Sequence, residues 1–348
     1  MLTSTHLFKE IHEQPEVIQR LLETAYKSVQ QLGQAILTRQ IDHVVIAARG
    51  TSDNAGIYAK YILGAINGLT VSLATPSLYT IYQRPPKFGN VLLLGISQSG
   101  KSPDIVAVVA EARRQGVLTA AITNSPGSDL TKESDFIIDL NAGEEKSVAA
   151  TKTYTAELAS IALLSAVLAP DKTLLDELKA VPAAVASTLS MNEEIASLAP
   201  RYRYMDSCVV IGRGYNYATA FEMALKMKEL TYSVVQAYSS ADFLHGPMAV
   251  IERGFPVIVI APAGMMEGVM GAFVQELNKN MAEVIAISDV ASVLQRSKIL
   301  LTLPHSVPEW LSPLTTIIPG QLLSLHLAHE RGFDVDSPRS IKKVTETH

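Results

Sequence analysis

HVVIAARG (residues 43–50) and CVVIGRG (208–214) share one pattern, a short apolar run that ends in turn residues. Such runs are typical of buried parallel strands. Gly214 follows Gly50 by 164 residues, and Gly264 follows Gly100 by the same interval. An internal repeat of this kind predicts two copies of one fold. Three further pairs of runs occur in the same order: VLLLGISQSG (91–100) with PVIVIAPAG (256–264), LTAAITN (118–124) with AEVIAISD (282–289), and FIIDL (136–140) with ILLTL (299–303).

Amphipathic stretches such as residues 102–116 and 267–281 lie between these runs, so strands alternate with helices. This alternation builds a parallel sheet with helices on both faces. We expect an α/β protein of two tandem domains, each a three-layer α/β/α, flavodoxin-like unit. The expected division is a helical lead-in, a first domain, a helical linker, a second domain and a polar C-terminal tail: 1–40, 41–170, 171–200, 201–333 and 334–348.

The composition excludes several classes of protein. The chain of 348 residues is 48% hydrophobic and 18% charged, which is typical of a globular protein. Its net charge of −5 comes without a basic block, so we expect no nucleic-acid partner. The N-terminus lacks a signal-peptide core, no apolar run is long enough to span a membrane, and the single cysteine, Cys208, falls in a predicted buried strand. We expect a soluble cytoplasmic protein without disulfides or membrane contact.

The apolar runs that begin at residues 43 and 91 each lead into a hydroxyl-rich turn. The first turn is Gly50-Thr51-Ser52, and the second is residues 97–102, with the sequence SQSGKS. Ligands of parallel sheets bind at the carboxyl ends of the strands, and a phosphate is bound by the free N–H groups of a helix N-terminus together with nearby hydroxyl groups. The two turns therefore predict one shared phosphate site. The alternative is that these residues only cap helices, a common role of serine and threonine.

The second turn also matches a nucleotide-binding pattern, because GISQSGKS (95–102) has the spacing G-x-x-x-x-G-K-S. Two features argue against a P-loop. The interior of the turn is SQS rather than glycine-rich, and a nucleotide site explains neither the internal repeat nor the polar residues further along the chain.

Residues 217–235 have helical periodicity, with Met223, Met227, Leu230 and Val234 on a predicted buried face. Glu222, Lys226 and Glu229 form a second stripe, which on an exposed helix would be an ordinary ion-pair ladder. The segment that follows favours a functional role instead, because its polar and aromatic residues are of the kind that line pockets: Tyr232, Gln236, Tyr238, Asp242 and His245-Gly246-Pro247.

Together with the two turns, the blocks KSVAATKTY (146–154), ALKMKELTYSVVQAYSSADFLHGP (224–247) and DVDSPRSIKKVTE (334–346) resemble a known family. The chain is similar, over nearly its whole length, to the double-SIS (sugar isomerase) proteins. The likeness is to the isomerase domain of glucosamine-fructose-6-phosphate aminotransferase and to stand-alone amino-sugar-6-phosphate deaminases.

The resemblance implies phosphate binding by Ser52, Ser97, Gln98, Ser99 and Ser102, and sugar contacts by Thr51 and the backbone near Val148. It implies that Glu229 moves a proton between C1 and C2, assisted by Lys226 and Glu222. It further implies that His245, from a partner subunit, opens the sugar ring and that Lys343 forms a Schiff base with the open-chain ketose. No cofactor or metal is implied, and the expected assembly is a homodimer with a shared site.

Three positions depart from the family pattern: Lys101 replaces an acidic residue, Ala150 a hydroxyl residue and Lys342 a small one. Lys342 leaves open which tail lysine reaches the substrate. No terminal cysteine nucleophile of a glutaminase is present. We therefore expect a deaminase that converts glucosamine 6-phosphate to fructose 6-phosphate and ammonia. A fructosamine-6-phosphate deglycase, a deaminase for another hexosamine phosphate and a non-catalytic phosphosugar sensor are the alternatives.

Overall fold

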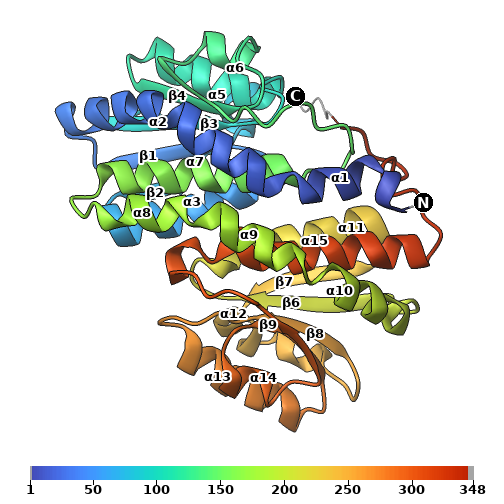
Figure 1. Cartoon of the computed structure of the whole chain (residues 1–348). Coiled ribbons are helices and arrows are strands. Elements are labelled where there is room, and N and C mark those ends of the chain that lie inside the picture. The colour runs from blue at the N-terminus through green and yellow to red at the C-terminus, as the bar shows by residue number, and fades with distance from the viewer. Residues whose placement is uncertain (1, 344–348) are drawn as a thin grey trace. The chain divides into compact units, whose positions relative to one another are not determined.

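The structure, a computed structural model, describes residues 2–343 and contains two five-stranded parallel sheets flanked by helices (Figure 1). Sheet A has the strand order β2-β1-β3-β4-β5, and sheet B has the equivalent order β7-β6-β8-β9-β10. The α/β fold with a repeated parallel sheet is thus confirmed. The strands are β1 (His43–Ala47), β2 (Thr70–Leu73), β3 (Val91–Ile96), β4 (Leu118–Thr123), β5 (Phe136–Asp139), β6 (Ser207–Gly212), β7 (Val234–Ser239), β8 (Pro256–Ile260), β9 (Glu283–Ser288) and β10 (Ile299–Thr302).

The chain forms two compact units that do not follow chain order, and each is described by itself. Among the described residues, unit A contains sheet A and comprises residues 16–145, 152–179 and 342–343. Unit B contains sheet B and comprises residues 1–15, 146–151 and 180–341. The lead-in and the linker are both helical and are divided between the units. Of the expected tail, residues 344–348 lie outside the described residues.

Helices cover the sheet of each unit. Unit A has most of α2 (Gln14–Thr38), with α3 (Thr51–Asn67), α4 (Ser77–Thr80), α5 (Pro103–Arg114), α6 (Asp129–Lys132), α7 (Lys152–Leu168) and α8 (Thr173–Lys179). Unit B has α1 (His6–His12), α9 (Val181–Leu189), α10 (Asn192–Leu198), α11 (Asn216–Thr231), α12 (Ser240–Leu244), α13 (Glu267–Lys279), α14 (Ala291–Leu294) and α15 (Pro313–Glu330). Short 3₁₀ helices are η1 (Leu2–Ser4), η2 (Ala199–Tyr202), η3 (Pro247–Val250) and η4 (Glu309–Leu311).

The edge strands β2 and β7 were not predicted from the sequence. Both lie at the end of a sheet and are only partly buried, so neither has the continuous apolar run of a central strand. The placement of Val234 on a buried helix face is wrong. Helix α11 ends at Thr231, Tyr232 has a left-handed backbone with φ of 57°, and Val234 begins β7 with 65% of its surface exposed.

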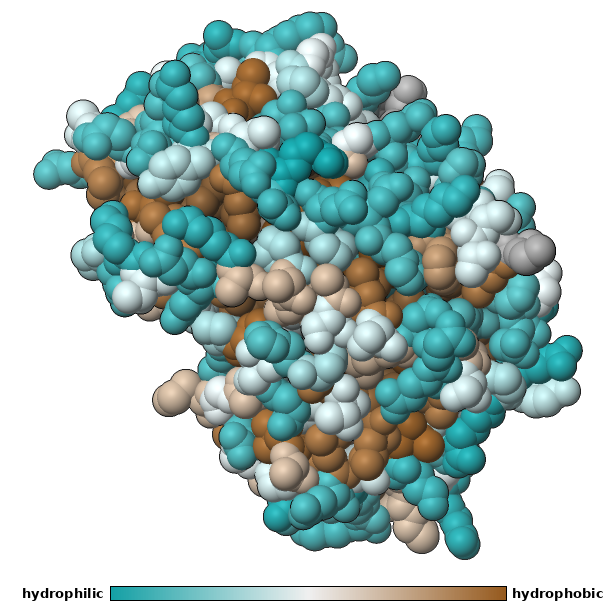
Figure 2. Space-filling view, viewed as in Figure 1, coloured by the Kyte–Doolittle hydropathy of each residue, from teal (hydrophilic) through white to brown (hydrophobic). Residues whose placement is uncertain are grey.

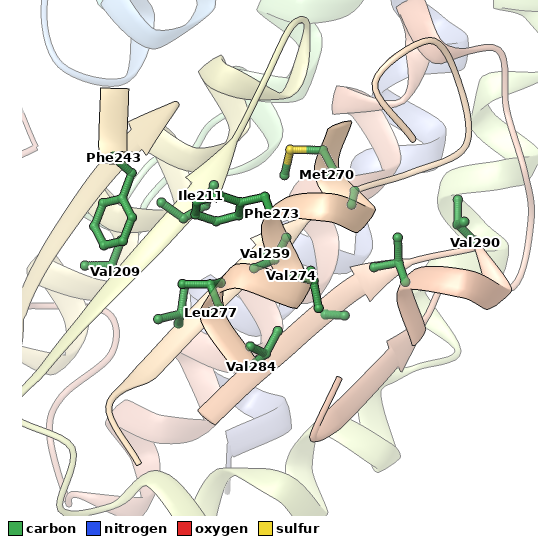
Figure 3. Packing of buried hydrophobic residues seen from close by; sticks show 14 residues of the cluster. Val209, Ile211, Phe243, Val259, Met270, Phe273, Val274, Leu277, Val284 and Val290 are labelled. Atoms are coloured by element: carbon green, nitrogen blue, oxygen red, sulfur yellow. The ribbon is translucent and has the colours of Figure 1, made fainter. Parts of the chain in front are cut away.

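The core of unit B shows why the predicted amphipathic stretch at 267–281 is a helix. One face of α13 places Met270, Phe273, Val274 and Leu277 over sheet B, where they pack with the strand residues of one buried cluster (Figure 3). That cluster includes Val209, Ile211, Val257, Val259, Val284 and Ala286. Burying such side chains stabilises the fold by roughly 1.5–3 kcal/mol for each large aliphatic or aromatic residue.

Hydrophilic residues dominate the face shown in Figure 2, with smaller patches of hydrophobic residues between them. Within residues 2–343, no helix combines the length and the apolar composition that crossing a membrane requires. Cys208 is buried in β6, as predicted, and burial raises the pKa of its thiol to about 12. The thiol therefore stays protonated near neutral pH, which removes it as a nucleophile.

His326 on α15 gives unit B a defined pH dependence. Its side chain is buried, and its Nε2 lies 2.9 Å from Asn192 Oδ1, which fixes Nε2 as the donor. Burial lowers the pKa of His326. The nearby carboxylate of Glu193 opposes this shift in part, and His329 adds to it. Because the unfolded chain binds this proton more tightly than the folded one, the stabilisation is complete above about pH 6.5 and is lost as the pH falls.

We predict that the melting temperature of the protein falls more steeply between about pH 7 and about pH 5 than that of His326→Gln, which retains a donor toward Asn192 but cannot titrate. Differential scanning calorimetry at several pH values measures this difference. Equal acid dependence of the two proteins would contradict the assignment.

Candidate active site

The two hydroxyl-rich turns of unit A follow the carboxyl ends of two neighbouring strands of sheet A, β1 and β3. β1 pairs in parallel with β3, with Ala47 opposite Gly95, so the carboxyl ends of the two strands lie side by side. Thr51 begins α3, and residues 97–102 connect β3 to α5. The structure therefore places the first turn of α3 and the β3–α5 loop at the ends of adjacent strands. The first turn of α3 carries the expected sugar contact Thr51 and the expected phosphate ligand Ser52, and the loop carries the other expected phosphate ligands, Ser97, Gln98, Ser99 and Ser102.

Helix capping does not explain these hydroxyl groups. Gly50 occupies the N-cap of α3, and Ser102 at the N-cap of α5 makes no side-chain capping bond. Ser97 Oγ accepts a hydrogen bond from the Gly100 N–H at 3.1 Å, and Ser99 Oγ accepts one from the Lys101 N–H at 3.3 Å. A hydroxyl oxygen that accepts a hydrogen bond still has its own O–H to donate. The second turn is thus shaped by its serines and retains donors for an anion.

Arg49 and Asp104 connect the two turns, and sequence reasoning missed both. Arg49 Nε lies 2.7 Å from Asp104 Oδ2, and the aspartate side chain is only 1% exposed. Arg49 precedes the first turn, and Asp104 is in the first helical turn after the second. A positive and a negative residue just after two neighbouring strands, Arg49 after β1 and Asp104 after β3, are the sequence signal that could have revealed this pair.

Ser52 has a buried partner on α7. Its hydroxyl donates to Glu157 Oε1 at 2.8 Å, and both side chains are almost fully buried. A hydroxyl group has one hydrogen to donate. Donation from Ser52 to a phosphate therefore requires this hydroxyl to rotate away from Glu157.

The P-loop pattern does not correspond to a loop. Gly95, its first glycine, lies inside β3, where it pairs with Ala47 and Ala121. Lys101 is exposed and precedes α5, which begins only at Pro103. The stretch GISQSGKS therefore spans the end of a strand and a short turn.

The charged stripe of α11 forms a compact ion-pair triad in unit B. Lys226 Nζ lies 2.5 Å from Glu229 Oε2 and 3.5 Å from Glu222 Oε1. The side chains of Lys226 and Glu222 are 1% and 0% exposed, whereas that of Glu229 is 22% exposed. The stripe is therefore not an exposed surface ladder. Glu229 is its solvent-accessible member.

Packing of α11 against α15 fixes the position of this triad. A Cβ atom at Gly320 of α15 would lie 2.8 Å from Met223 Cγ, so glycine permits the close approach of the two helices. At the start of α11, Asn216 Nδ2 donates to Ser312 Oγ at 2.8 Å, and Thr316 Oγ1 donates to Asn216 Oδ1 at 2.7 Å. α11 is thus held at both its apolar face and its N-terminus.

Val148 lies in a segment of unit B that is held from two sides. Its N–H donates to the Asp336 carbonyl at 3.3 Å. The buried Glu10 of α1 accepts hydrogen bonds from the Lys146 N–H at 2.5 Å and from the Ser147 hydroxyl. The N–H of Val148 is therefore engaged, and sequence reasoning missed the contribution of Glu10.

His245 follows α12 on an exposed turn of unit B. Among the described residues, its side chain has no hydrogen bond or ion pair to Glu229. Tyr232, expected to line a pocket, instead holds the tail. Its hydroxyl accepts from the Arg339 N–H at 2.9 Å, and the Arg339 guanidinium lies 4.0 Å from the ring centroid.

The other predicted pocket residues have local partners. Tyr238 donates to Gln236 Oε1 at 2.5 Å, and Asp242 accepts from Ser239 Oγ at 2.7 Å. In unit A, Lys343 Nζ lies 2.6 Å from the buried Glu145 Oε2, whereas Lys342 is exposed. Of the two tail lysines, Lys343 is the one with a fixed position.

Residues 37–167 and 203–331 each match the SIS domain family. The chain is a member of the SIS family. The two matched segments contain sheet A and sheet B, so the internal repeat corresponds to a pair of SIS domains.

Two relatives place the chain within the SIS family. The glutamine–fructose-6-phosphate aminotransferase [isomerizing] of Shewanella oneidensis is 34% identical over 97% of this chain, which spans 58% of that protein. The C-terminal domain of glucosamine-fructose-6-phosphate aminotransferase from Francisella tularensis has a TM-score of 0.88 and 29% identity, covering 96% of this chain and 98% of that domain. The chain is thus related to the C-terminal domain of these enzymes and spans somewhat more than half of their length.

A third similarity concerns the fold alone. The glucosamine-6-phosphate deaminase of Thermotoga maritima has a TM-score of 0.78 at 20% identity, and the alignment covers 99% of this chain and 100% of that one.

The SQSG turn leaves no room for a side chain at Gly100. A Cβ atom there would lie 2.0 Å from Ser128 Oγ, and the backbone has φ of +61°. We predict that Gly100→Ala displaces the turn and weakens binding of an anionic ligand such as inorganic phosphate, measured by calorimetry, by about tenfold or more, because even one misplaced donor costs about 1–3 kcal/mol.

Gly116→Ala is the matched control. Gly116 has a similar left-handed backbone, with φ of +78°, but nothing within 4 Å of its Cβ position. The control should bind phosphate like the wild type, and replacing Ser128 by glycine in Gly100→Ala should restore part of the affinity. Equal phosphate affinity of Gly100→Ala and the wild type would contradict the role of this turn.

Proposed function

We propose that this SIS protein is a phosphosugar isomerase that acts as a deaminase: glucosamine 6-phosphate and water give fructose 6-phosphate and ammonia. The observation that carries the proposal is the triad on α11, where an accessible carboxylate, Glu229, contacts a buried ammonium group, Lys226, at 2.5 Å. An ionised carboxylate with access to a ligand is the form that removes a proton next to a carbonyl or imine.

In this mechanism the hydroxyl-rich turns bind the phosphate, with Ser52, Ser97, Gln98, Ser99 and Ser102 as donors and Thr51 and the Val148 backbone on the sugar. His245 opens the ring by exchanging protons with the hemiacetal, a step suited to imidazole near neutral pH. Glu229 then takes the C2 proton and returns it to C1. Water hydrolyses the resulting C2 imine and releases ammonia.

Lys226 holds Glu229 in place and supplies a proton donor beside it, and Glu222 is the second carboxylate of Lys226. Lys343 forms an imine with the open-chain ketose. These groups account for each proton transfer, so the proposed reaction requires no cofactor. The proposed assembly is a cytoplasmic homodimer in which His245 comes from the partner subunit, without nucleic acid or membrane.

Ammonia release from a panel of hexosamine 6-phosphates tests the proposed activity. We expect the glucosamine compound to release ammonia with fructose 6-phosphate as co-product, in the presence of EDTA and without nucleotide. Preference for the galacto isomer would assign a different hexosamine, and release of an amino acid from fructosamine 6-phosphates would assign a deglycase. Saturable binding without turnover of any panel member would indicate a sensor.

Base and phosphate-binding residues should differ in their kinetic effects. Glu229→Gln keeps the shape of the side chain but removes the base, so kcat should fall by about 10²–10⁴-fold with little change in KM. Ser99→Ala removes a contact that is equal in the ground and transition states, so its effect should appear mainly in KM.

Steady-state kinetics of both variants with glucosamine 6-phosphate separates the two effects. A near-normal kcat for Glu229→Gln would remove Glu229 from the mechanism, and Glu222 would be the next candidate. A fall in kcat alone for Ser99→Ala would exclude uniform phosphate binding as the role of Ser99.

A further inference from the structure

Glu145 is a buried carboxylate of unit A that contacts the tail lysine. Its Oε2 lies 2.6 Å from Lys343 Nζ, and its side chain is 0% exposed, whereas that of Lys343 is 23% exposed. A long lysine side chain normally has many rotamers, and a contact with a fixed carboxylate restricts them. The amine of Lys343 is therefore positioned by a carboxylate that is itself buried.

Thr153, in the first turn of α7, fixes the orientation of Glu145. The Thr153 hydroxyl donates to Glu145 Oε2 at 2.8 Å, and the Thr153 N–H donates to Oε1 at 3.2 Å. The first N–H groups of a helix have no partner within the helix, and its N-terminus favours a negative charge. Both carboxylate oxygens are thus bound, and Oε2 is shared between Thr153 and Lys343.

The same face of α7 also contacts Ser52, in the first hydroxyl-rich turn. Glu157 follows Thr153 by four residues, so the two side chains lie one turn apart, about 6 Å along the axis. Glu157 accepts the hydroxyl hydrogen of Ser52, the expected phosphate ligand of the first turn. One rigid helix therefore sets the position of Lys343, through Glu145, and of Ser52, through Glu157.

We infer that Glu145 positions Lys343 for imine formation and takes up its proton as the amine attacks. This inference rests on the proposed function, because it assumes a ketose 6-phosphate as ligand. The sequence gives Glu145 no predicted role, because in it Glu145 is simply one of two adjacent glutamates.

The step balances without a further reactant. The Lys343 ammonium gives one proton to Glu145, and the neutral amine attacks C2 of the ketose to form an N–C bond. The resulting carbinolamine loses its hydroxyl group as water, with the proton returned by Glu145. The products are a protonated imine on Lys343 and one water molecule, so charge and atoms are conserved.

Borohydride trapping tests the inference with the whole protein. Fructose 6-phosphate and sodium borohydride are added, hydride reduces the imine at C2, and mass spectrometry measures the modified fraction of the peptide that contains Lys343. In Glu145→Gln, which keeps the shape but not the charge, the trapping rate should fall by about 10²-fold. Glu145→Asp, which keeps the charge, should trap faster than Glu145→Gln.

The matched control is Asp176→Asn. Asp176 forms an ion pair of similar length, 2.9 Å, with Lys179 on α8 of the same unit, but both side chains are exposed. This variant should trap at the wild-type rate. Thr153→Val removes one hydrogen-bond donor to Glu145 but leaves the carboxylate, so its trapping rate should fall less than that of Glu145→Gln. If Glu145→Gln does not fold, Thr153→Val takes its place as the test variant.

Wild-type trapping in Glu145→Gln, or in Thr153→Val if the former is unfolded, would overturn the inference. So would modification of Lys342 in place of Lys343. Failure of the proposed function is distinguishable from these outcomes. A wild-type protein that releases no ammonia but traps fructose 6-phosphate in a Glu145-dependent manner contradicts deamination alone. Ammonia release with trapping that does not depend on Glu145 contradicts this inference alone.

Discussion

Lys226 is a charged side chain that is buried on α11, where its Nζ forms ion pairs with the carboxylates of Glu222 and Glu229. Transfer of an unpaired ammonium group out of water costs several kcal/mol, and removal of one partner of a buried pair typically destabilises a protein by about 3–5 kcal/mol. Glu222 and Glu229 therefore cannot be placed independently of Lys226. The constraint also extends to α15, because α11 must pack closely enough at Gly320 to cover the pair. What remains accessible is one carboxylate, Glu229, in a fixed orientation.

The same principle recurs in unit A, where buried carboxylates hold side chains at or beside the proposed site. Asp104 holds Arg49 between the two turns, Glu157 holds Ser52, and Glu145 holds Lys343. In each case the acidic partner is almost fully buried, whereas Arg49 and Lys343 remain accessible. These three side chains are thus each held by a buried carboxylate. The parallel pairing of β1 and β3 places the carboxyl ends of these strands, and hence both turns, side by side.

The sequence predicted the central strands well, since a run such as VLLLGI must be buried on both faces of its sheet. It failed at β2 and β7, which are partly exposed edge strands, and at Val234, because the left-handed Tyr232 that ends α11 follows no local rule for a tyrosine. Among the candidate site residues, spacing alone placed Glu222, Lys226 and Glu229 on one face, and their burial came from tertiary packing. Glu10, Glu145 and Glu157 were missed because Ser147, Lys343 and Ser52, which they respectively contact, lie 105 to 198 residues away along the chain.

In the proposed reaction, Glu229 removes the C2 proton of an amino-sugar phosphate. The rate at which deuterium is lost from C2 of [2-²H]glucosamine 6-phosphate, followed by NMR, reports on this bond directly. If Glu229 has this role, we expect a primary isotope effect on this step in the wild type and a rate lower by at least about 10²-fold in Glu229→Gln. Loss of the C2 deuterium at the wild-type rate in a folded Glu229→Gln protein would contradict it.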